Sequence, residues 1–329
     1  MVALTVKPGI ENIALQECKA TGIDAMIAAE GVLTARDLES DKNYDLCFSS
    51  WLLFEAQMIA FEKFTAGAKK IADWYSDSIR SERIEQKWPL VYLVFSENGY
   101  TADLEKSRII AEQLKKKVSR IARLAVPGYP AKQGLIEGLI VVETPKRELL
   151  FSRTARFFGQ RRMKFDPSAP SRSFLKIEEA FSVMGRSPSS AETVTDLGAA
   201  PGGWSYSASK KGARVFAIDN GPLKKGAARN TLIEHLRQDA FLYKPEKPTD
   251  WLFCDMVEDP FRVIKLVKKW LKNRLCKHAV VNFKYGHADP VRLLAVIRSK
   301  EGLRTLSKNV ICRHLYHDRD EFTVIISID

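Results

Sequence analysis

The sequence predicts an α/β fold whose last domain is a doubly wound, mostly parallel sheet with an antiparallel hairpin at one edge. After residue 173, apolar runs of strand length alternate with helical segments, which is the pattern of a parallel sheet covered by helices. The last two runs are separated only by HDRDE, which is too short for a crossover helix and therefore predicts the hairpin. Two small α+β domains are expected before this sheet.

The composition is typical of a globular protein. The chain has 329 residues, 45% of them apolar, and five cysteines without a C-x-x-C pair, so neither a disulfide framework nor a metal site is predicted. The amino end lacks a signal-peptide pattern, and the longest apolar runs are far too short to span a bilayer. We therefore expect a cytoplasmic protein with no membrane partner; the oligomeric state is left open.

Positive charge is concentrated toward the carboxyl end. Of the formal net charge of +12, residues 1–60 carry −5, residues 61–150 carry +4 and residues 151–329 carry +13. Lys and Arg that neutralise phosphates release counterions, so this distribution favours a polyanion such as RNA as a partner. Surface charge that only keeps the protein in solution explains it equally well.

Four segments are distinguished along the chain. The first is acidic and combines strand-like runs with one helical segment; the second combines short strands with one long helix. A stretch rich in Arg, Pro and Ser leads into the last domain. The predicted boundaries are 1–60 and 61–150 for the two α+β domains, 151–172 for the linker and 173–329 for the last domain.

The linker, FSRTARFFGQRRMKFDPSAPSR, interleaves basic and aromatic side chains. Bases of single-stranded RNA stack on Phe rings and Arg planes, so the segment is a candidate RNA contact. The alternative is structural: the Phe side chains pack between domains and the arginines are merely exposed. The candidate RNA-binding residues are Arg153, Arg156, Arg161, Arg162 and Lys164.

The last domain begins with the helical segment SFLKIEEAFSVMG. Ser173 is a candidate N-cap and Gly185 a candidate stop, with Phe174 and Ile177 on the buried face. Lys176 then lies on the opposite face and can point into a cleft. The strands expected after this helix are TVTDLG, RVFAID, DWLFCD, AVVNFK, VICRHLY and FTVIIS.

The stretch DLGAAPGGW ends the first of these strands, at the place where a doubly wound sheet binds its ligand. Gly198, Gly202 and Gly203 do not fit G-x-G-x-x-G, and the chain has no P-loop pattern, so a phosphate cradle is disfavoured. A small turn beside carboxylates suits S-adenosylmethionine, which presents an ammonium, a sulfonium and a ribose diol. The candidate cofactor residues are Asp196, Gly198, Ala200, Pro201, Gly202, Gly203 and Trp204, with packing on the following helix as the alternative for Trp204.

Three further carboxylates stand at successive strand ends. Asp219 follows the second strand, where nucleotide-binding α/β folds place the residue that binds ribose hydroxyls. Asp239 is a candidate for the adenine amino group, and Asp255 ends the strand DWLFCD. Each alone is typical of an exposed loop, but their shared position predicts one site.

These motifs, with NFK and LYHDRDEFTV, make the carboxyl-terminal half resemble the FtsJ-like ribose 2′-O-methyltransferases, most closely the M-type members that act on bacterial large-subunit (23S) ribosomal RNA. The resemblance implies a Rossmann-like, S-adenosylmethionine-dependent methyltransferase domain, preceded by a ferredoxin-like and a THUMP-like RNA-binding domain. It implies a cytidine of 23S rRNA, or of its precursor, as the target. It also implies a donor contact for Ser173 and a catalytic tetrad of Lys176, Asp255, Lys284 and Glu321.

The expected chemistry gives each tetrad residue a role. Methyl transfer to a ribose hydroxyl needs alignment and removal of the hydroxyl proton, with no metal. Lys284 is the expected general base, which requires the neutral amine; desolvation and the cation of Lys176 are expected to favour that form against the effect of Asp255 and Glu321. Asp255 is expected to orient Lys284 and the donor, and Glu321 to anchor one lysine. Taken singly, a lysine after a strand is typical of a solvated end and a hairpin glutamate of an edge charge.

Other interpretations of the chain stay open. The same reaction on another RNA fits the residues, and a non-catalytic RNA-binding or ribosome-assembly factor fits the fold, although such a factor has no chemical need for the tetrad. A dehydrogenase is disfavoured because the dinucleotide glycine pattern is absent. His314 and His317 have no further ligands nearby in the sequence and do not predict a metal site.

Overall fold

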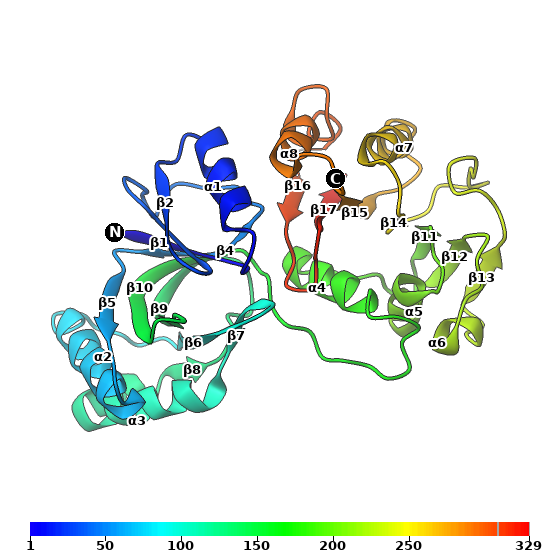
Figure 1. Cartoon of the computed structure of the whole chain (residues 1–329). Helices are drawn as coiled ribbons and strands as arrows, with labels where there is room; N and C mark the ends of the chain where they lie inside the picture. Colours follow the sequence, from blue (N-terminus) through cyan, green and yellow to red (C-terminus); the bar gives the residue numbers. More distant parts are fainter. Residues whose placement is uncertain (308, 329) are drawn as a thin grey trace. The chain divides into compact units, whose positions relative to one another are not determined.

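The protein divides into two compact units (Figure 1). The structure is a computed structural model that describes residues 1–307 and 309–328. One unit spans Met1–Gly159 and the other begins at Gln160. Of the net charge of +12, the amino-terminal unit carries +1 and the carboxyl-terminal unit +11. None of the helices in the described ranges is both long enough and apolar enough to cross a membrane.

A ten-stranded sheet organises the amino-terminal unit. Its elements are β1 (Val2–Val6), α1 (Glu11–Ala20), β2 (Ala25–Ala29), β3 (Val32–Ala35), β4 (Ser49–Phe54), β5 (Gln57–Ala60), α2 (Phe64–Ser78), β6 (Trp88–Ser96), β7 (Gly99–Ala102), α3 (Leu104–Ala122), β8 (Ala125–Pro127), β9 (Gly134–Glu143) and β10 (Glu148–Phe157). The strand order is β2-β3-β1-β4-β10-β9-β6-β7, with β5 paired to β10 and β8 to β6. Helices α2 and α3 pack on the sheet through an apolar cluster that includes Ile71, Leu90 and Ile110.

The predicted linker is wrong in its first part. Residues 151–157 belong to strand β10, which pairs with β4 so that Arg156 lies opposite Leu52. Strands from both predicted α+β domains therefore flank β10 in one sheet, β4 on one side and β9 on the other. Leu53 and Ile140, one from each predicted domain, belong to the same core cluster. The ferredoxin-like and THUMP-like identities of these parts stay predictions.

A seven-stranded sheet organises the carboxyl-terminal unit. Its elements are α4 (Phe174–Met184), β11 (Thr193–Leu197), α5 (Gly203–Lys210), β12 (Arg214–Ile218), α6 (Lys225–Ala228), β13 (Ile233–Leu236), β14 (Trp251–Cys254), α7 (Pro260–Lys272), β15 (His278–Lys284), α8 (Pro290–Arg298), β16 (Asn309–Arg313) and β17 (Glu321–Ser327). The strand order is β13-β12-β11-β14-β15-β17-β16. The first five strands in this order are parallel, and β17 runs antiparallel to both β15 and β16, so the predicted hairpin is confirmed. Strand β13 has no counterpart among the predicted strands.

Helices cover both faces of this second sheet. Figure 1 shows α4 and α5 on one side and α7 and α8 on the other. The core beneath α4 and α5 joins Ile177 and Trp204 to the strand residues Val194, Phe253 and Val280. In a parallel sheet covered in this way, ligand-binding side chains collect at the carboxyl ends of the strands, which here belong to β11, β12, β14 and β15.

Helix α4 begins and ends where the sequence predicts, but without the predicted cap. Gly185 follows the helix with a φ of 71°, the left-handed conformation that a stop glycine supplies. Ser173 has helical dihedral angles and its side chain caps no backbone N–H of the helix, so that expectation is wrong. Its hydroxyl instead lies 2.7 Å from the hydroxyl of Ser171.

A buried glutamate on α4 holds two separate segments against the helix. The carboxylate of Glu179 accepts hydrogen bonds from the backbone N–H groups of Arg161 (3.1 Å), Tyr316 (2.8 Å) and His317 (3.2 Å). Burial raises the pKa of Glu179 well above its ordinary value, against the effect of these hydrogen bonds. Glu179 therefore fixes the loop between β16 and β17, which leads to Glu321.

Glu179→Ala should destabilise the carboxyl-terminal unit by about 3–5 kcal/mol, because buried backbone donors lose their acceptor. Urea unfolding followed by tryptophan fluorescence measures the change. Glu178→Ala is the matched control: this neighbouring carboxylate is partly exposed in its ion pair with Lys211, so its loss should cost about 1 kcal/mol or less. Equal effects of the two variants would contradict the role assigned to Glu179.

Candidate active site

The DLGAAPGGW turn connects β11 to α5 and requires glycine at two positions. Gly198 has a φ of 74° and Gly202 a φ of 104°, both in the left-handed region. A Cβ on Gly198 would collide with the side chain of Met256, and a Cβ on Gly202 with Ala227. The turn therefore packs closely against its neighbours at these two points, as the sequence motif suggests.

A cavity of about 330 Å³ lies at the carboxyl ends of β11, β12 and β14. Four of the residues that line it carry carboxylates: Asp219, Asp239, Asp255 and Glu258. Gly198 and Ala200 from the glycine turn, together with Asn220, Gln238 and Phe241, form further parts of the wall.

Backbone N–H groups orient two of these carboxylates. Asp219 accepts hydrogen bonds from Ala200 N at Oδ2 (3.0 Å) and from Gly221 N at Oδ1 (2.7 Å). Asp239 Oδ1 accepts from Phe241 N (2.8 Å). A carboxylate offers about four lone-pair sites, so both side chains keep acceptor capacity for a ligand.

The lining favours a ligand with positive charge and hydroxyl groups. Among the described residues, the walls of this cavity contain four carboxylates and neither Lys nor Arg. A pyrophosphate would be repelled by this set, whereas a sulfonium, an ammonium and a ribose diol each find acceptors. The residues therefore fit S-adenosylmethionine and do not fit a dinucleotide.

Only part of the predicted cofactor set lines the cavity. Trp204 is buried against Phe253, and its Nε1–H donates to the backbone oxygen of Ser173 (3.0 Å), so Trp204 packs the helix. The predicted residues that line the cavity are Gly198, Ala200, Asp219, Asp239 and Asp255. Those outside its lining are Ser173, Asp196, Pro201, Gly202, Gly203 and Trp204.

Asp196 is buried under the turn. It accepts a hydrogen bond from Ser205 Oγ at 2.6 Å, which connects the end of β11 to α5. Burial, and then the carboxylates of Asp255 and Asp219, raise the pKa of Asp196 to about 7 despite that hydrogen bond. Asp196 therefore stabilises the glycine turn by holding α5 against the end of β11.

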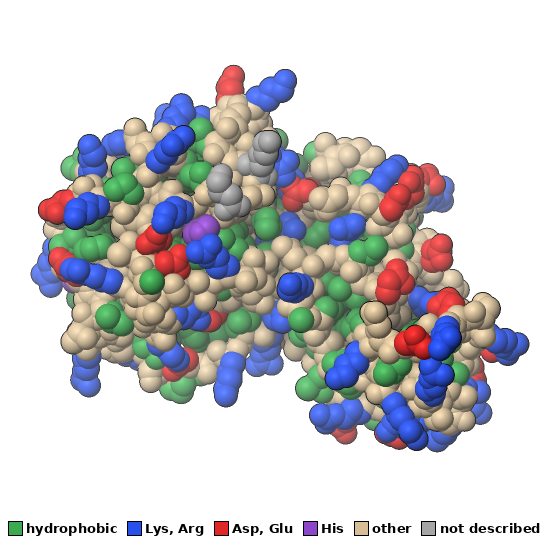
Figure 2. Space-filling model, turned by 180° about the vertical axis from the view of Figure 1, so that it is seen from behind, with side chains coloured by type: hydrophobic (Ala, Val, Ile, Leu, Met, Phe, Trp, Pro, Cys, Tyr) green, Lys and Arg blue, Asp and Glu red, His purple; other side chains and the backbone are tan. Residues whose placement is uncertain are grey.

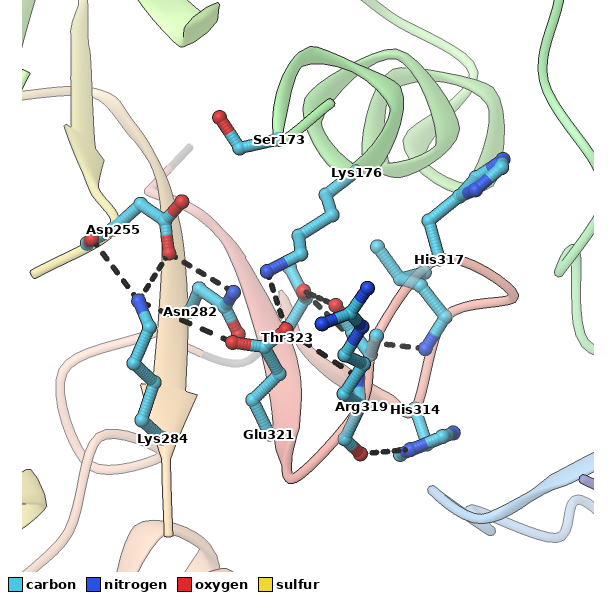
Figure 3. Close-up of polar contacts among 12 residues, drawn as sticks. Ser173, Lys176, Asp255, Asn282, Lys284, His314, His317, Arg319, Glu321 and Thr323 are labelled. Carbon is cyan, nitrogen blue, oxygen red and sulfur yellow. Dashed lines mark hydrogen bonds and ion pairs between the residues drawn. The ribbon is translucent and has the colours of Figure 1, made fainter. Parts of the chain in front are cut away.

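Strand pairing brings the predicted catalytic residues onto one face. Strands β15 and β17 pair with Lys284 directly opposite Glu321 and Asn282 opposite Thr323. Side chains two residues apart on a strand point to the same face, so these four lie together. Asp255 follows β14, the parallel neighbour of β15, and reaches the same cluster (Figure 3).

Oxygen atoms surround the amine of Lys284. Its Nζ lies 2.6 Å from Oδ1 of Asp255, 3.1 Å from the backbone oxygen of Asp255 and 3.4 Å from that of Met256. Asn282 Nδ2 donates to the same Oδ1 of Asp255 (3.1 Å). Asp255 thus lines the acidic cavity and also contacts the amine of Lys284.

Lys176 reaches the cluster from α4 and contacts Glu321 (Figure 3). Its Nζ donates to Oε1 of Glu321, while Nζ of Lys284 lies 4.0 Å from Oε2 of the same residue. Glu321 therefore stands between the two lysines. Only 13% of the Lys176 side chain and 8% of the Glu321 side chain are exposed, so this ion pair is shielded from water. All four residues of the expected tetrad lie in one cluster.

The surroundings stabilise opposite charges on Lys176 and Glu321. Burial lowers the pKa of Lys176, but the carboxylates of Asp255, Asp318 and Glu321 raise it, and the net pKa lies above the ordinary lysine value. Burial raises the pKa of Glu321, but Lys176 and Lys284 lower it, and the net pKa lies below the ordinary glutamate value. Lys176 is therefore an ammonium and Glu321 a carboxylate at neutral pH.

Sequence reasoning missed three buried residues behind this cluster: Asn282, Asp318 and Thr323. Asp318 accepts hydrogen bonds from Leu315 N (2.9 Å) and from the Thr323 hydroxyl (3.2 Å). Burial raises the pKa of Asp318 to about 8, although Lys176 opposes the shift. The sequence spacing could have predicted that Asn282 and Thr323 belong to this cluster. Each lies two residues along its strand from a tetrad residue, so its side chain points to the same face.

Two predicted RNA-binding arginines make contacts within the amino-terminal unit. Arg153 forms a bidentate ion pair with Glu82, at 2.8 and 2.6 Å. The guanidinium of Arg156 donates to two backbone oxygens, those of Ser40 (3.2 Å) and Lys42 (2.7 Å). Both guanidinium groups therefore hold parts of the amino-terminal unit together, and RNA contact at these positions stays a prediction.

The other three candidates follow β10. Arg162 and Lys164 are exposed and Arg161 is half-buried. Lys164 lines a second cavity of the carboxyl-terminal unit. On the face of the molecule drawn in Figure 2, Lys and Arg side chains are spread among Asp and Glu instead of gathering in one patch.

The histidines near the site make backbone contacts. His314 Nε2 lies 2.9 Å from the backbone oxygen of Arg319, and Met163 N donates to His317 Nε2 (2.9 Å). Within residues 1–307 and 309–328, no group of three or more His, Cys, Asp or Glu is arranged to hold a metal ion.

Comparison with known proteins agrees with this geometry. Residues 169–289 match the model of the family described as FtsJ-like methyltransferase. The chain contains an FtsJ-like methyltransferase domain. The matched range includes Lys176, Asp219, Asp255 and Lys284 and ends before Glu321.

Curated relatives of the FtsJ-like domain share one name. Ribosomal RNA large subunit methyltransferase M of Azotobacter vinelandii is 42% identical over 175 residues, which are 50% of this chain and 50% of that protein. The proteins of the same name from Marinomonas sp. (41% over 180 residues; 52% of this chain, 51% of that protein) and Pseudomonas syringae pv. syringae (43% over 175 residues; 50% and 49%) are similar. This chain spans about half the length of the curated relatives it matches.

Asp318→Asn should flatten the pH dependence of stability. Because burial raises the pKa of Asp318 from 3.8 to about 8, the folded state binds more protons than the unfolded state between about pH 4 and pH 8. The free energy of unfolding of the wild type should therefore fall as the pH rises through this window, by up to about 1.4 kcal/mol per pH unit from this group. Asparagine does not titrate, so the variant should lack this component in urea unfolding across the window.

Asp250→Asn is the control for that experiment. Burial raises the pKa of Asp250, but Lys277 and Thr193 hold it below its ordinary value, so this carboxylate titrates at lower pH. Its replacement should leave the slope between about pH 5 and pH 8 unchanged. A slope for Asp318→Asn equal to that of the wild type would contradict the burial argument.

Proposed function

We propose that this chain is an S-adenosylmethionine-dependent RNA ribose 2′-O-methyltransferase that modifies large-subunit ribosomal RNA. The observation that carries the proposal is the double contact of Asp255, which lines the acidic cavity and lies 2.6 Å from the amine of Lys284. A donor site and a candidate base thereby lie side by side, and an in-line transfer requires the reacting groups to be held close together. The FtsJ-like domain and the names of the curated relatives support the same reaction.

The residues of the acidic cavity would hold the methyl donor. Bound S-adenosylmethionine supplies an electrophilic methyl group on a sulfonium. Asp219 would accept hydrogen bonds from the ribose hydroxyls, and Asp239 from the adenine amino group. Asp255 would face the positive charge, since it lies at the end of the cavity nearest Lys284.

Lys284 would act as the general base: in its neutral amine form, its Nζ would take the proton of the ribose 2′-hydroxyl and become the ammonium that pairs with Asp255. A base must be within about 2.6–3.2 Å of the atom that it deprotonates, so its position must be fixed. Asp255 and two backbone oxygens fix the amine of Lys284. Lys176, which stays an ammonium, would stabilise the negative charge that develops on the ribose oxygen. Glu321 would position both lysines from opposite oxygens of one carboxylate.

The RNA substrate is supported by charge and by the relatives. The carboxyl-terminal unit carries a net charge of +11, which favours a polyanion. The curated relatives carry ribosomal RNA large subunit methyltransferase in their names. A cytidine target and RNA binding by a THUMP-like part of the amino-terminal unit rest on the resemblance alone. The same reaction on a different RNA is the second candidate.

Lys284→Ala should reduce methyl transfer by at least about 100-fold, because general base catalysis contributes at least that factor. Transfer of labelled methyl from S-adenosylmethionine to unmodified large-subunit rRNA measures it, and nuclease mapping identifies the modified ribose. Lys277→Ala is the matched control, since Lys277 is an exposed lysine just before the same strand. Donor binding should be near normal in both variants. Retained turnover in Lys284→Ala would remove the base assignment, and no transfer by the wild type to any RNA would favour a binding role.

Asp219→Asn should weaken donor binding by roughly 10-fold or more, because hydrogen bonds to a charged group contribute about 1.5–3 kcal/mol. Calorimetric titration with S-adenosylmethionine and with S-adenosylhomocysteine measures the change. Both ligands carry the ribose, so both should lose affinity equally. Loss confined to S-adenosylmethionine would mean that Asp219 acts on the sulfonium instead. Glu246→Gln, at an exposed loop position, is the control and should leave both affinities unchanged.

A further inference from the structure

A second cavity of the carboxyl-terminal unit is separate from the acidic one. Its volume is about 520 Å³, and its walls are formed by residues of α4, by residues of α5 with Lys211 directly after it, and by the segment 163–167. Among the described residues, no residue lines both cavities. The function proposed above leaves this second cavity unused.

An exposed aromatic ring forms part of the wall. Phe165 is 59% exposed, and its ring meets the ring of Phe174 at a steep angle, with 6.4 Å between centroids. Packing does not require a ring of this size to stay so open to water. A ring held against a second ring at the edge of a hollow offers a face on which a nucleic-acid base can stack.

Three lysines line the same cavity as Phe165: Lys164, Lys210 and Lys211. Nζ of Lys210 lies 2.6 Å from Oδ2 of Asp166, and Nζ of Lys211 lies 3.0 Å from Glu178. Lys210 uses one of its three donors on Asp166, and Lys211 uses two on the oxygens of Glu178, so Lys210 keeps two donors for a phosphate and Lys211 keeps one. The side chain of Lys164 is exposed beside Phe165. The cavity thus combines an aromatic face with phosphate-binding groups.

The first turn of α4 lies between this cavity and the catalytic cluster. Phe174 lines the cavity, whereas Lys176, two residues later, contacts Glu321 from the other side of the helix. Arg172 is exposed at the amino end of the same turn. A helix with its side chains is about 10–12 Å across, so a short single strand can reach both sites by passing over this end.

We propose that this cavity binds a nucleotide of single-stranded RNA that flanks the methylated one, with its base on Phe165 and its phosphate on Lys164 and Lys210. The inference rests on the function proposed above and adds a second contact with its substrate. A base that stacks on Phe165 must be unpaired, so single strands and loops are favoured over duplex RNA. An aromatic face accepts every base, so this contact adds affinity without selecting a sequence.

Lys164→Gln/Phe165→Ala should bind labelled single-stranded oligocytidylate roughly 5- to 100-fold more weakly than the wild type, since the loss of one base stack alone has an effect of this size. Fluorescence anisotropy at fixed salt measures the Kd. The matched control, Phe261→Ala/Lys265→Gln, removes the same groups from exposed positions on α7 and should bind as the wild type does. Phe165→Trp should keep the wild-type affinity, because an indole ring also stacks.

Lys164→Gln alone should reduce the slope of log K against log salt by about 0.7, the contribution of one phosphate contact to a single strand. Lys265→Gln should leave the slope unchanged. Calorimetry should show wild-type binding of S-adenosylmethionine in every variant, because the second cavity shares no residue with the acidic one.

Weaker RNA binding by the double variant, beside an unaffected control, would support the proposal. Equal RNA affinity of wild type, double variant and control, in a protein that still methylates RNA, would overturn the assignment of this cavity and leave the proposed function intact. A wild type that binds S-adenosylmethionine but no RNA would overturn both.

Discussion

The antiparallel pairing of β17 with β15 is the constraint on which the candidate site depends. It places Glu321 directly opposite Lys284 at the end of the pair. Because side chains alternate along a strand, a shift of one residue would turn Glu321 to the other face, and Lys176 would lose its partner. On that other face Phe283 lies opposite Phe322, with 6.0 Å between ring centroids, so core packing and the ion pairs require the same register.

A cluster of lysines and carboxylates that is shielded from water contributes little to the free energy of unfolding. Taking charges out of water costs several kcal/mol per ion, and well-packed apolar residues of similar volume are often at least as stable. The cluster nevertheless places two lysines and two carboxylates together, with the buried Asp318 behind them. The neighbours keep Lys176 charged and Glu321 ionised, so removing either partner would leave an uncompensated charge. Stability alone therefore gives no reason for such an arrangement, which is consistent with the catalytic role proposed for it.

The sequence predicted the residues whose positions follow from the order of strands in a parallel sheet. It did not predict the side chains whose orientation depends on tertiary packing. Asp219, Asp255 and Lys284 follow predicted strands, whose carboxyl ends must share one edge, so their proximity could be predicted. The motif does not say which way its side chains turn, which is why Trp204 packs a helix instead of lining the cavity. Strand β10 was not predicted because its arginines and aromatic residues suggested a linker. The alternation of its side chains indicates a strand only once its pairing with β4 is known. Asp318 is buried by a loop that a distant glutamate on α4 holds, which no local pattern reveals.

The proposed function requires the carboxyl-terminal unit to attract two ligands of opposite charge. Its net charge of +11 acts on a polyanion over roughly a Debye length, about 8–10 Å, whereas the carboxylates of the acidic cavity act at contact distance. A cationic donor would be repelled by a basic wall, and an RNA backbone by an acidic one, so the two environments must be separate and yet adjacent. The ion pair of Asp255 and Lys284 connects the acidic cavity to the cluster of lysines and carboxylates beside it, because Asp255 lines the cavity and Lys284 belongs to the cluster. In the proposed reaction the methyl group would leave the acidic cavity beside this ion pair, so Asp255 would act on the donor and on the base at once.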